Sequence, residues 1–256
     1  MKSKKYLAAL GSLILMLPVG AHAQTYVGVS GGLVLSGDSK NSGEFTSNVP
    51  ATTAFPAITS GTALNWATEY DKGYNIGVQI GHRFEGGLRF EADLSYSRSG
   101  IDKHVGMTVG TADISTRDSA ILTRRAAATT NPTVGTVLAS GIGKQQNYAA
   151  FGNVFYDFNA SGSFMPYAGV GGGLMRTKLD YRPSNLDVGQ SSDTNFAWQA
   201  MAGATVKLND SLELFGQYSY RDGGTTRMKL DLLPATIESK ARQSVVSAGV
   251  RLRFGG

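Results

Sequence analysis

Two histidines, His82 and His104, are the residues of this sequence best suited to acid–base chemistry, because the third, His22, lies in an N-terminal signal segment. A serine hydrolase places a histidine beside a serine and an acid. His82 falls on the apolar side of an alternating stretch, and His104 lies two residues after Asp102 in a long polar loop. Neither histidine has an evident serine–acid pair, so the sequence predicts no catalytic residue and no enzyme activity.

Two other patterns imitate ligand-binding motifs. The run Gly169-Val-Gly-Gly-Gly173 lacks the Lys-Ser/Thr pair that follows the glycines of a phosphate-binding loop. Asp180, Asp187 and Asp193 are spaced too widely for a calcium loop of the EF-hand kind. The chain has no cysteine, which excludes disulfides and thiolate metal sites. We therefore expect neither a metal nor a cofactor.

Charged side chains that alternate with apolar ones form the stronger candidate site. In residues 74–84 the even positions are apolar or aromatic, apart from His82, and the odd positions are polar or glycine. This alternation predicts a strand with one apolar and one polar face. The polar faces of this strand and of similar segments carry Arg83, Arg89, Glu91, Asp93, Asp157, Lys207, Glu213, Arg251 and Arg253.

The elements that position these charges are eight alternating segments, near 26–35, 74–84, 88–97, 148–158, 166–175, 196–208, 212–221 and 246–254. Short turns at 85–87, 159–163 and 209–210 alternate with long stretches near 36–73, 98–146, 180–194 and 222–242. A soluble β-sandwich gives no reason for every long connection to lie at one end, whereas an outer-membrane barrel does. We predict an all-β fold, an eight-stranded antiparallel up-and-down transmembrane barrel with four long external loops.

The N-terminal residues 1–23 have the features of a cleavable signal peptide. Lys2, Lys4 and Lys5 precede a short apolar run, and Ala21-His22-Ala23 matches a signal-peptidase site. The alternative, a membrane anchor, would need about 20 apolar residues. The mature barrel would then span 24–256 and carry a net charge near +2, from 21 basic and 19 acidic residues. So small an excess does not favour nucleic acid as a partner.

Several stretches resemble one broad family of eight-stranded surface-antigen barrels, which includes rickettsial-type major surface proteins, Opa-like adhesins and the OmpA-like membrane domain. They are Gly87-Leu-Arg-Phe-Glu-Ala-Asp-Leu-Ser-Tyr96, Asn153-Val-Phe-Tyr-Asp-Phe158, Met165-Pro-Tyr-Ala-Gly-Val-Gly-Gly-Gly173 and Gly249-Val-Arg-Leu-Arg-Phe254. The resemblance implies a bacterial outer-membrane location and surface contacts made by loops. It also implies that Phe254 is the C-terminal signal for the barrel assembly machinery, although Gly255 and Gly256 follow it here.

The charged residues on the polar faces of the strands have two interpretations from the sequence alone. Eight strands leave a lumen just wide enough for side chains, so the charges would form a paired polar plug. The other interpretation is a narrow solute or ion channel through the same charges. With a plug, function would lie in the external loops, as adhesion, surface antigen or envelope integrity. We expect outer-membrane lipid, lipopolysaccharide and host-surface molecules as partners, and a lipid-modifying enzyme is the third alternative.

Overall fold

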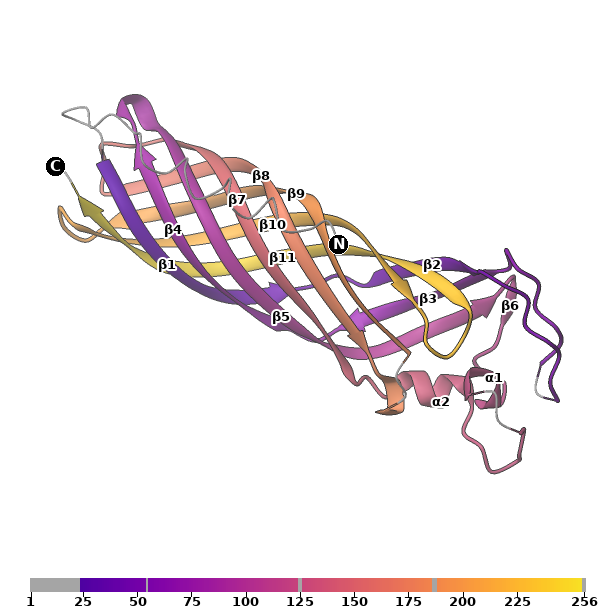
Figure 1. Cartoon of the computed structure of the whole chain (residues 1–256). Helices are drawn as coiled ribbons and strands as arrows, with labels where there is room; N and C mark the ends of the chain where they lie inside the picture. The colour runs from indigo at the N-terminus through magenta and orange to yellow at the C-terminus, as the bar shows by residue number, and fades with distance from the viewer. Residues whose placement is uncertain (1–23, 54, 124–125, 186–187, 255–256) are drawn as a thin grey trace.

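The computed structural model describes residues 24–53, 55–123, 126–185 and 188–254. The predicted signal peptide and Asp187 lie outside them. Eight antiparallel strands close into a ring through the pairing of the first with the last (Figure 1). In ring order they are β1 (Gln24–Leu35), β4 (Gly73–Arg83), β5 (Leu88–Val109), β7 (Gly143–Asp157), β8 (Phe164–Tyr181), β9 (Gly189–Lys207), β10 (Leu212–Lys229) and β11 (Ala235–Phe254). The predicted fold class is confirmed.

The two faces of the strands reverse the usual arrangement of a soluble protein. Large apolar side chains point outward and are exposed, as for Val29, Ile76 and Val170, whereas the interior of the same segments holds charged side chains such as Arg89 and Arg251. This inversion is the solution for a barrel surrounded by lipid. Aromatic pairs mark one border of the apolar band, among them Tyr96 and Tyr148, whose ring centroids are 5.0 Å apart.

Beyond this border the wall of strands continues, and we call this part of the molecule the extension. The stretches 36–73, 98–146, 180–194 and 222–242 were expected to be loops, and the structure corrects this because strands occupy much of each. The lipid-facing pattern could not reveal them, since a wall in water exposes polar residues and buries apolar ones. The extension is therefore the inverse of the membrane-spanning part in its polarity.

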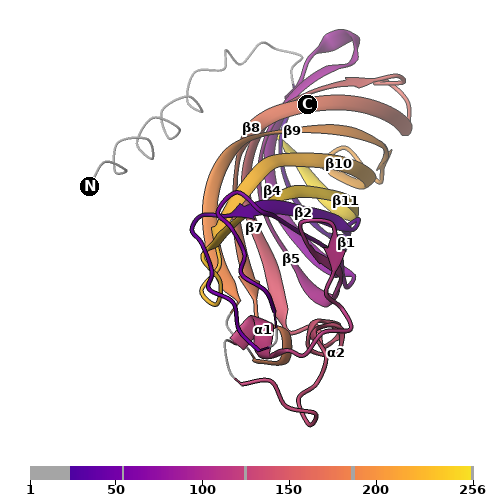
Figure 2. The same cartoon turned by 90° about the vertical axis from the view of Figure 1, so that its right-hand side faces the viewer.

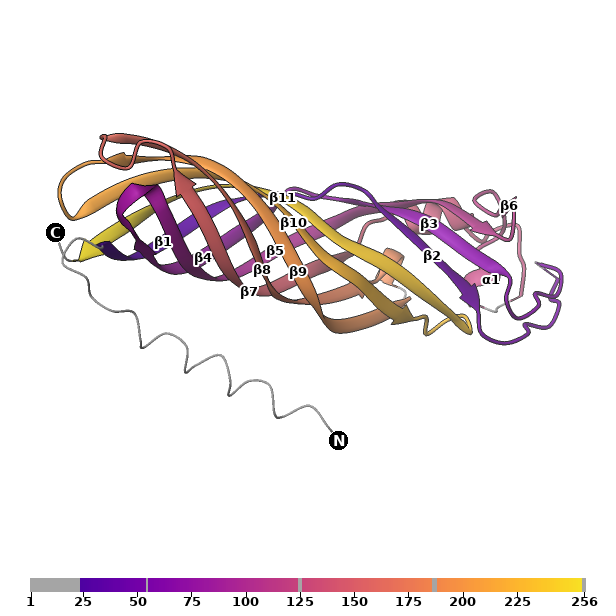
Figure 3. The ribbon, with the colours of Figure 1, turned by 90° about the horizontal axis from the view of Figure 1, so that it is seen from above.

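A hairpin completes the wall where β1 and β4 end. It consists of β2 (Ser39–Phe45) and β3 (Ala63–Tyr70). On one side β2 pairs with β11, and on the other side β3 pairs with β5. Figure 3 shows the two strands continuing along the cylinder to its far end. The first long connection is thus part of the barrel wall rather than a free loop.

The wall has a seam in the extension, between β9 and β10. Their backbone pairing ends at Trp198 and Asp222, and an irregularity at Gly223 and Gly224 follows, after which β10 remains paired with β11. Side chains of β9 bond the backbone of β10 instead: Ser191 Oγ donates to the Arg227 carbonyl (2.6 Å), Arg227 N–H donates to Asp193 (2.8 Å) and Asn195 Nδ2 donates to the Thr225 carbonyl (2.9 Å).

The extension has an apolar core of its own, which includes Phe45, Leu64, Ile101, Leu179 and Ile237. Short elements cover its far end (Figure 2): β6 (Ala112–Asp113), α1 (Ala120–Thr123), α2 (Val134–Ala139) and η2 (Pro183–Asn185). A single 3-10 turn, η1 (Glu85–Gly87), lies at the opposite end. In the described part of the chain, every helix is too short or too polar to cross a membrane.

Candidate functional site in the barrel lumen

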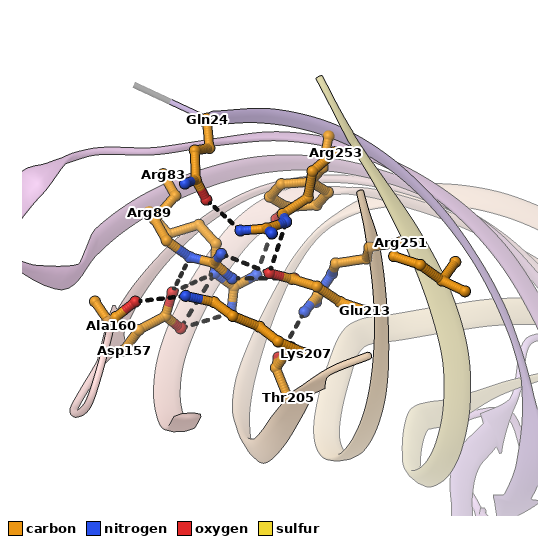
Figure 4. Close-up of polar contacts among 12 residues, drawn as sticks. Gln24, Arg83, Arg89, Asp157, Ala160, Thr205, Lys207, Glu213, Arg251 and Arg253 are labelled. Atoms are coloured by element: carbon orange, nitrogen blue, oxygen red, sulfur yellow. Dashed lines mark hydrogen bonds and ion pairs between the residues drawn. The ribbon is translucent and has the colours of Figure 1, made fainter. Parts of the chain in front are cut away.

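The lumen holds a network of buried ion pairs near the short turns (Figure 4). Asp157 accepts hydrogen bonds from Arg83 Nε at 2.7 Å and from Arg89 Nε at 3.2 Å. Glu213 accepts two from Arg83, at 2.9 and 3.3 Å, and Arg253 Nε lies 3.3 Å from the same carboxylate. The bonds from Arg83 to Asp157 and to Glu213 join strands that are not neighbours in the wall, so these charges tie the barrel together across its interior.

Glu91 is the centre of the next group. Its Oε2 accepts hydrogen bonds from Tyr26 (2.5 Å), Arg89 (3.1 Å) and Arg251 (3.3 Å). Arg251 also donates to Thr205 Oγ1 at 3.0 Å. Arg89 thus links Glu91 to Asp157, which makes the two groups one continuous network. Tyr26 is a member that the charge pattern of the sequence did not indicate, since a phenol carries no charge.

Aromatic rings fill the space between the charges. The Arg89 guanidinium carbon lies 4.0 Å from the Phe155 ring centroid, and that of Arg251 lies 4.0 Å from the Phe215 ring centroid. Cation–π contacts of this kind gain strength where water is absent. Arg89, Arg251 and Glu213 are each 0% exposed. The network therefore fills its level of the lumen, leaving these groups without contact with solvent.

Two residues of the predicted set lie apart from this network. Lys207 is at its edge, where Nζ donates to the Ala160 carbonyl at 3.1 Å. Asp93 lies higher in the lumen, 3.8 Å from Arg221 Nη2, and accepts a hydrogen bond from Gln79 at 3.1 Å. Arg221 is buried and joins Asp93 to the amide Gln199. The sequence pattern showed that Arg221 faces the lumen, but it did not show the level along the barrel axis at which Arg221 meets Asp93.

Above Asp93 the lumen becomes uncharged and then apolar. Ser97 donates to Gln243 at 3.1 Å, and Thr177 donates to Asn147 at 2.8 Å. The apolar core of the extension follows, with a cavity of about 20 Å³ lined in part by Trp66, His104 and Tyr181. A volume of this size holds about one water molecule. Polarity along the axis thus falls from ion pairs to amides to an almost closed apolar compartment.

His104 lies inside this compartment, which corrects its expected place in an external loop. A shift in register between Glu69 and Tyr70 of β3 places an irregularity at this point of β5, so that the even-numbered His104 is buried; a second shift, between Asn65 and Ala67, returns burial to odd numbers at Met107 and Val109. The Nδ1 atom of His104 lies 2.8 Å from Thr68 Oγ1, and its ring packs edge-on against Trp66. Burial lowers the pKa of His104 to about 4, so the imidazole is neutral at pH 7.

The other sequence candidates lie away from one another. His82 is at an outward position but is only 3% exposed; its Nδ1 lies 3.0 Å from Thr25 Oγ1, and its ring contacts Phe84. Gly169, Gly171 and Gly173 face the interior, where a Cβ at Gly171 would lie within 1.9 Å of Asn153.

In the residues that the structure describes, no three His, Asp or Glu side chains gather as a metal site. Phe254 ends β11 with its ring outward.

A closed ring of eight strands with a lipid-facing band and a polar lumen defines the outer-membrane β-barrel class. The family model described as outer membrane protein beta-barrel domain matches residues 7–254, and the chain belongs to that family. It is a protein of the bacterial outer membrane.

The similarity to individual proteins is lower or covers less of the chain than the match to the family. A segment of 77 residues is 34% identical to outer membrane protein PagN of Salmonella typhimurium, and it covers 28% of this chain and 32% of that one. The match thus spans about a third of the length of this curated relative. Among solved structures, OprG of Pseudomonas aeruginosa has a TM-score of 0.59 at 11% identity, covering 91% of this chain and 96% of that one. Neisserial surface protein A has a TM-score of 0.44 at 17% identity, with coverages of 90% and 97%.

Proposed function

We propose that the protein is a non-catalytic, surface-exposed barrel that acts through contacts made by its extension outside the cell. The observation that carries this proposal is the division of the interior into a charged, filled level within the membrane and a separate folded compartment beyond it. The first level anchors and closes the barrel. The second presents a rigid outer surface.

The filled level supports a plug rather than a channel. An ion that crossed it would have to displace Arg89 or Arg251, and both are bonded to carboxylates and stacked on aromatic rings. Removing one partner from a buried ion pair costs about 3–5 kcal/mol, which opposes such rearrangement. A narrow channel would instead need a hydrated path between the charges.

The extension supports a binding surface. Its wall is made of paired strands and its interior is apolar, so its outer side chains are held on a stable scaffold. Binding residues on a rigid support lose less entropy when a ligand orders them. Phe254, on the last strand that closes the ring, would serve as the signal that the assembly machinery reads.

Orientation can be tested with single cysteines, because the natural chain has none. Ser42 is exposed in β2, and Ser161 is exposed in the turn at the opposite end. In intact cells, a membrane-impermeant maleimide should label Ser42→Cys, whereas Ser161→Cys should react only after the outer membrane is permeabilised. The reverse pattern would place the extension in the periplasm and overturn the proposal.

Function is then tested by conductance and adherence. The refolded wild type should be silent in a planar bilayer, and cells that produce it should adhere to a host-cell monolayer. Replacing residues 46–62 at the tip of the β2–β3 hairpin with a short turn should reduce adherence without changing surface labelling. Stable salt-dependent openings, abolished by changing Arg89 or Glu91, would instead establish a channel.

A further inference from the structure

His104 is a buried titratable side chain that takes no part in the ion-pair network of the lumen. It is 3% exposed and lines the cavity of about 20 Å³ in the extension. Its Nε2 atom and the Nε1 atom of Trp66, which lines the same cavity, have no hydrogen-bond partner in the part of the chain that the structure describes. Unpartnered polar atoms destabilise a closed interior. The apolar compartment thus has a weak point at His104.

A chain of hydrogen bonds holds the imidazole in its neutral form. Asn41 Nδ2 donates to Thr68 Oγ1 at 2.7 Å, and Thr68 Oγ1 lies 2.8 Å from His104 Nδ1. Because the Asn41 amide donates to the Thr68 oxygen, the Thr68 hydroxyl is placed to donate its own proton to Nδ1, and the ring proton then lies on Nε2. A second ring proton would have to occupy Nδ1, where it would meet the hydroxyl hydrogen. Protonation of His104 therefore disrupts this chain.

A short segment closes the compartment at its far end (Figure 2). It consists of the described residues between 114 and 139 and contains α1 and α2; we call it the cap. Leu122 and Leu138 of the cap line the same cavity as His104. The Ser184 hydroxyl donates to the Val137 carbonyl at 3.1 Å. Helices of four and six residues depend on packing for their stability, so the cap can detach without breaking the pairing of the wall strands.

The titratable side chains that face the imidazole are phenols. The Tyr181 ring of β8 has its centroid 4.9 Å from that of His104, and the Tyr181 hydroxyl lies 3.2 Å from the hydroxyl of Tyr70 in β3. Burial raises the pKa of Tyr70 well above its ordinary value, so this group stays uncharged in acid. Burial is also what lowers the pKa of His104. The compartment thus offers an imidazolium no charged partner among the described residues.

Charged groups on the surrounding elements lie toward the surface. Glu69 of β3 pairs with Lys103 of β5 at 3.1 Å, and Asp180 of β8 pairs with Arg182 at 2.9 Å. Asp118 of the cap accepts hydrogen bonds from the backbone of the cap itself. The other charged side chains of these elements are exposed, and they include Asp102, Arg117, Lys229 and Asp231. A proton on His104 would therefore have to be compensated by water.

We propose that the compartment is an acid-sensitive latch, in which His104 takes up a proton as the cap moves away and exposes the apolar side chains beneath it. An imidazolium needs hydration or a carboxylate, and the closed compartment supplies neither. Displacement of the cap admits water while the strands of the wall stay paired. The surface exposed in acid would include Trp66, Leu230 and Leu233, which line the cavity on the wall side.

The test is amide hydrogen exchange of the refolded mature protein in detergent micelles at pH 7 and pH 5, with rates corrected for the intrinsic effect of pH. Exchange in α2 should become roughly 20-fold faster at pH 5, because the opened compartment restores the ordinary pKa of His104. Exchange in residues 150–157 of β7 should not change. His104→Phe keeps a ring that cannot titrate and should abolish the response. The matched control, His82→Phe, removes the other histidine of residues 24–256 and should keep it.

Three results would overturn the inference: equal exchange in α2 at both pH values, an unchanged pH response in His104→Phe, or equal acceleration in residues 150–157, which would mean that acid unfolds the whole barrel. If His104→Phe does not show the gel-mobility shift of a folded barrel, His104→Gln replaces it, because its amide is neutral at both pH values and can accept from Thr68. An apolar fluorescent dye should bind the wild type at pH 5 and not at pH 7. These measurements use purified protein and do not depend on which side of the membrane the extension lies.

Discussion

Arg83 and Glu213 form a two-point ion pair across the lumen, with Nη1 and Nη2 at 2.9 and 3.3 Å from the two carboxylate oxygens. Their strands, β4 and β10, are separated in the wall by β1 and β11. The pair consequently fixes the distance between two parts of the ring that no backbone ladder joins. Its burial makes it a determinant of stability for the whole barrel.

Replacing Glu213 by glutamine should destabilise the barrel by about 3–5 kcal/mol, because Arg83 and Arg253 would lose the carboxylate that compensates them in a buried site. Urea unfolding in detergent micelles measures this difference. Glu238→Gln is the control, since its partner Arg227 is 75% exposed and exposed pairs contribute less than about 1 kcal/mol. Equal effects of the two substitutions would contradict a structural role for the lumen pair.

The stability of the extension should fall as the pH decreases from about 6.5 to about 4. The pKa of His104 in the folded protein is about 4, below its ordinary value of 6.5, so the unfolded chain binds a proton first as the pH falls. The full difference corresponds to roughly 3 kcal/mol, fully present above pH 6.5. Thermal melts followed by Trp66 fluorescence, in a Trp198→Phe background, report on this compartment. His104→Phe should flatten the pH profile, and an unchanged slope would contradict the assignment.

The β2–β3 hairpin should lose its place in the wall in Gly43→Ala. A Cβ at Gly43 would lie within 1.9 Å of the Thr236 carbonyl oxygen, which is too close for the β2–β11 ladder to persist. We expect proteolysis within 46–62 in the variant under conditions that leave the wild type intact. Gly37→Ala is the control, because a Cβ there meets nothing within 4 Å. Equal resistance of Gly43→Ala would show that the hairpin is held by other contacts.

The seam between β9 and β10 should open locally when its side-chain bonds are removed. Asp193→Ala removes the acceptor of the Arg227 amide, a loss of about 1 kcal/mol in local opening energy. Hydrogen exchange at Arg227 should then become about five-fold faster, while the global unfolding midpoint changes little. Gln190→Ala, on the same strand, should leave the exchange rate as it is. Protection unchanged in Asp193→Ala would mean that the seam is closed by the main chain.

The sequence was sufficient for the part of the fold that lipid surrounds. In 74–84 the alternation of apolar and polar residues is regular, because one face must meet lipid and the other must meet the lumen. The structure agrees over that stretch: Ile76 and Val78 are exposed, and Asn75 and Gln79 are buried. The same reasoning could not extend past Tyr74 into the extension, because apolar side chains face the interior there.

His104 and Asp93 show two further reasons why the sequence did not predict all contacts of the lumen. An irregularity in β5 changes the parity of the strand locally, at His104, and no residue type in Asp102-Lys-His104 indicates it. Asp93 shares its parity with Glu91, but the sequence does not give the stagger of neighbouring strands and therefore not the height at which partners meet. Its contacts with Arg221 and Gln79 depend on that stagger.

The place of the β2–β3 hairpin also determines what an antibody can recognise on the extension. Ser42 of β2 is directly opposite Glu238 of β11, although almost 200 residues separate them along the chain. Any footprint on this side of the protein combines residues from both ends of the sequence. Such epitopes exist only in the folded barrel, so antisera raised against short peptides of β2 would bind boiled protein on a blot and leave the folded protein unbound.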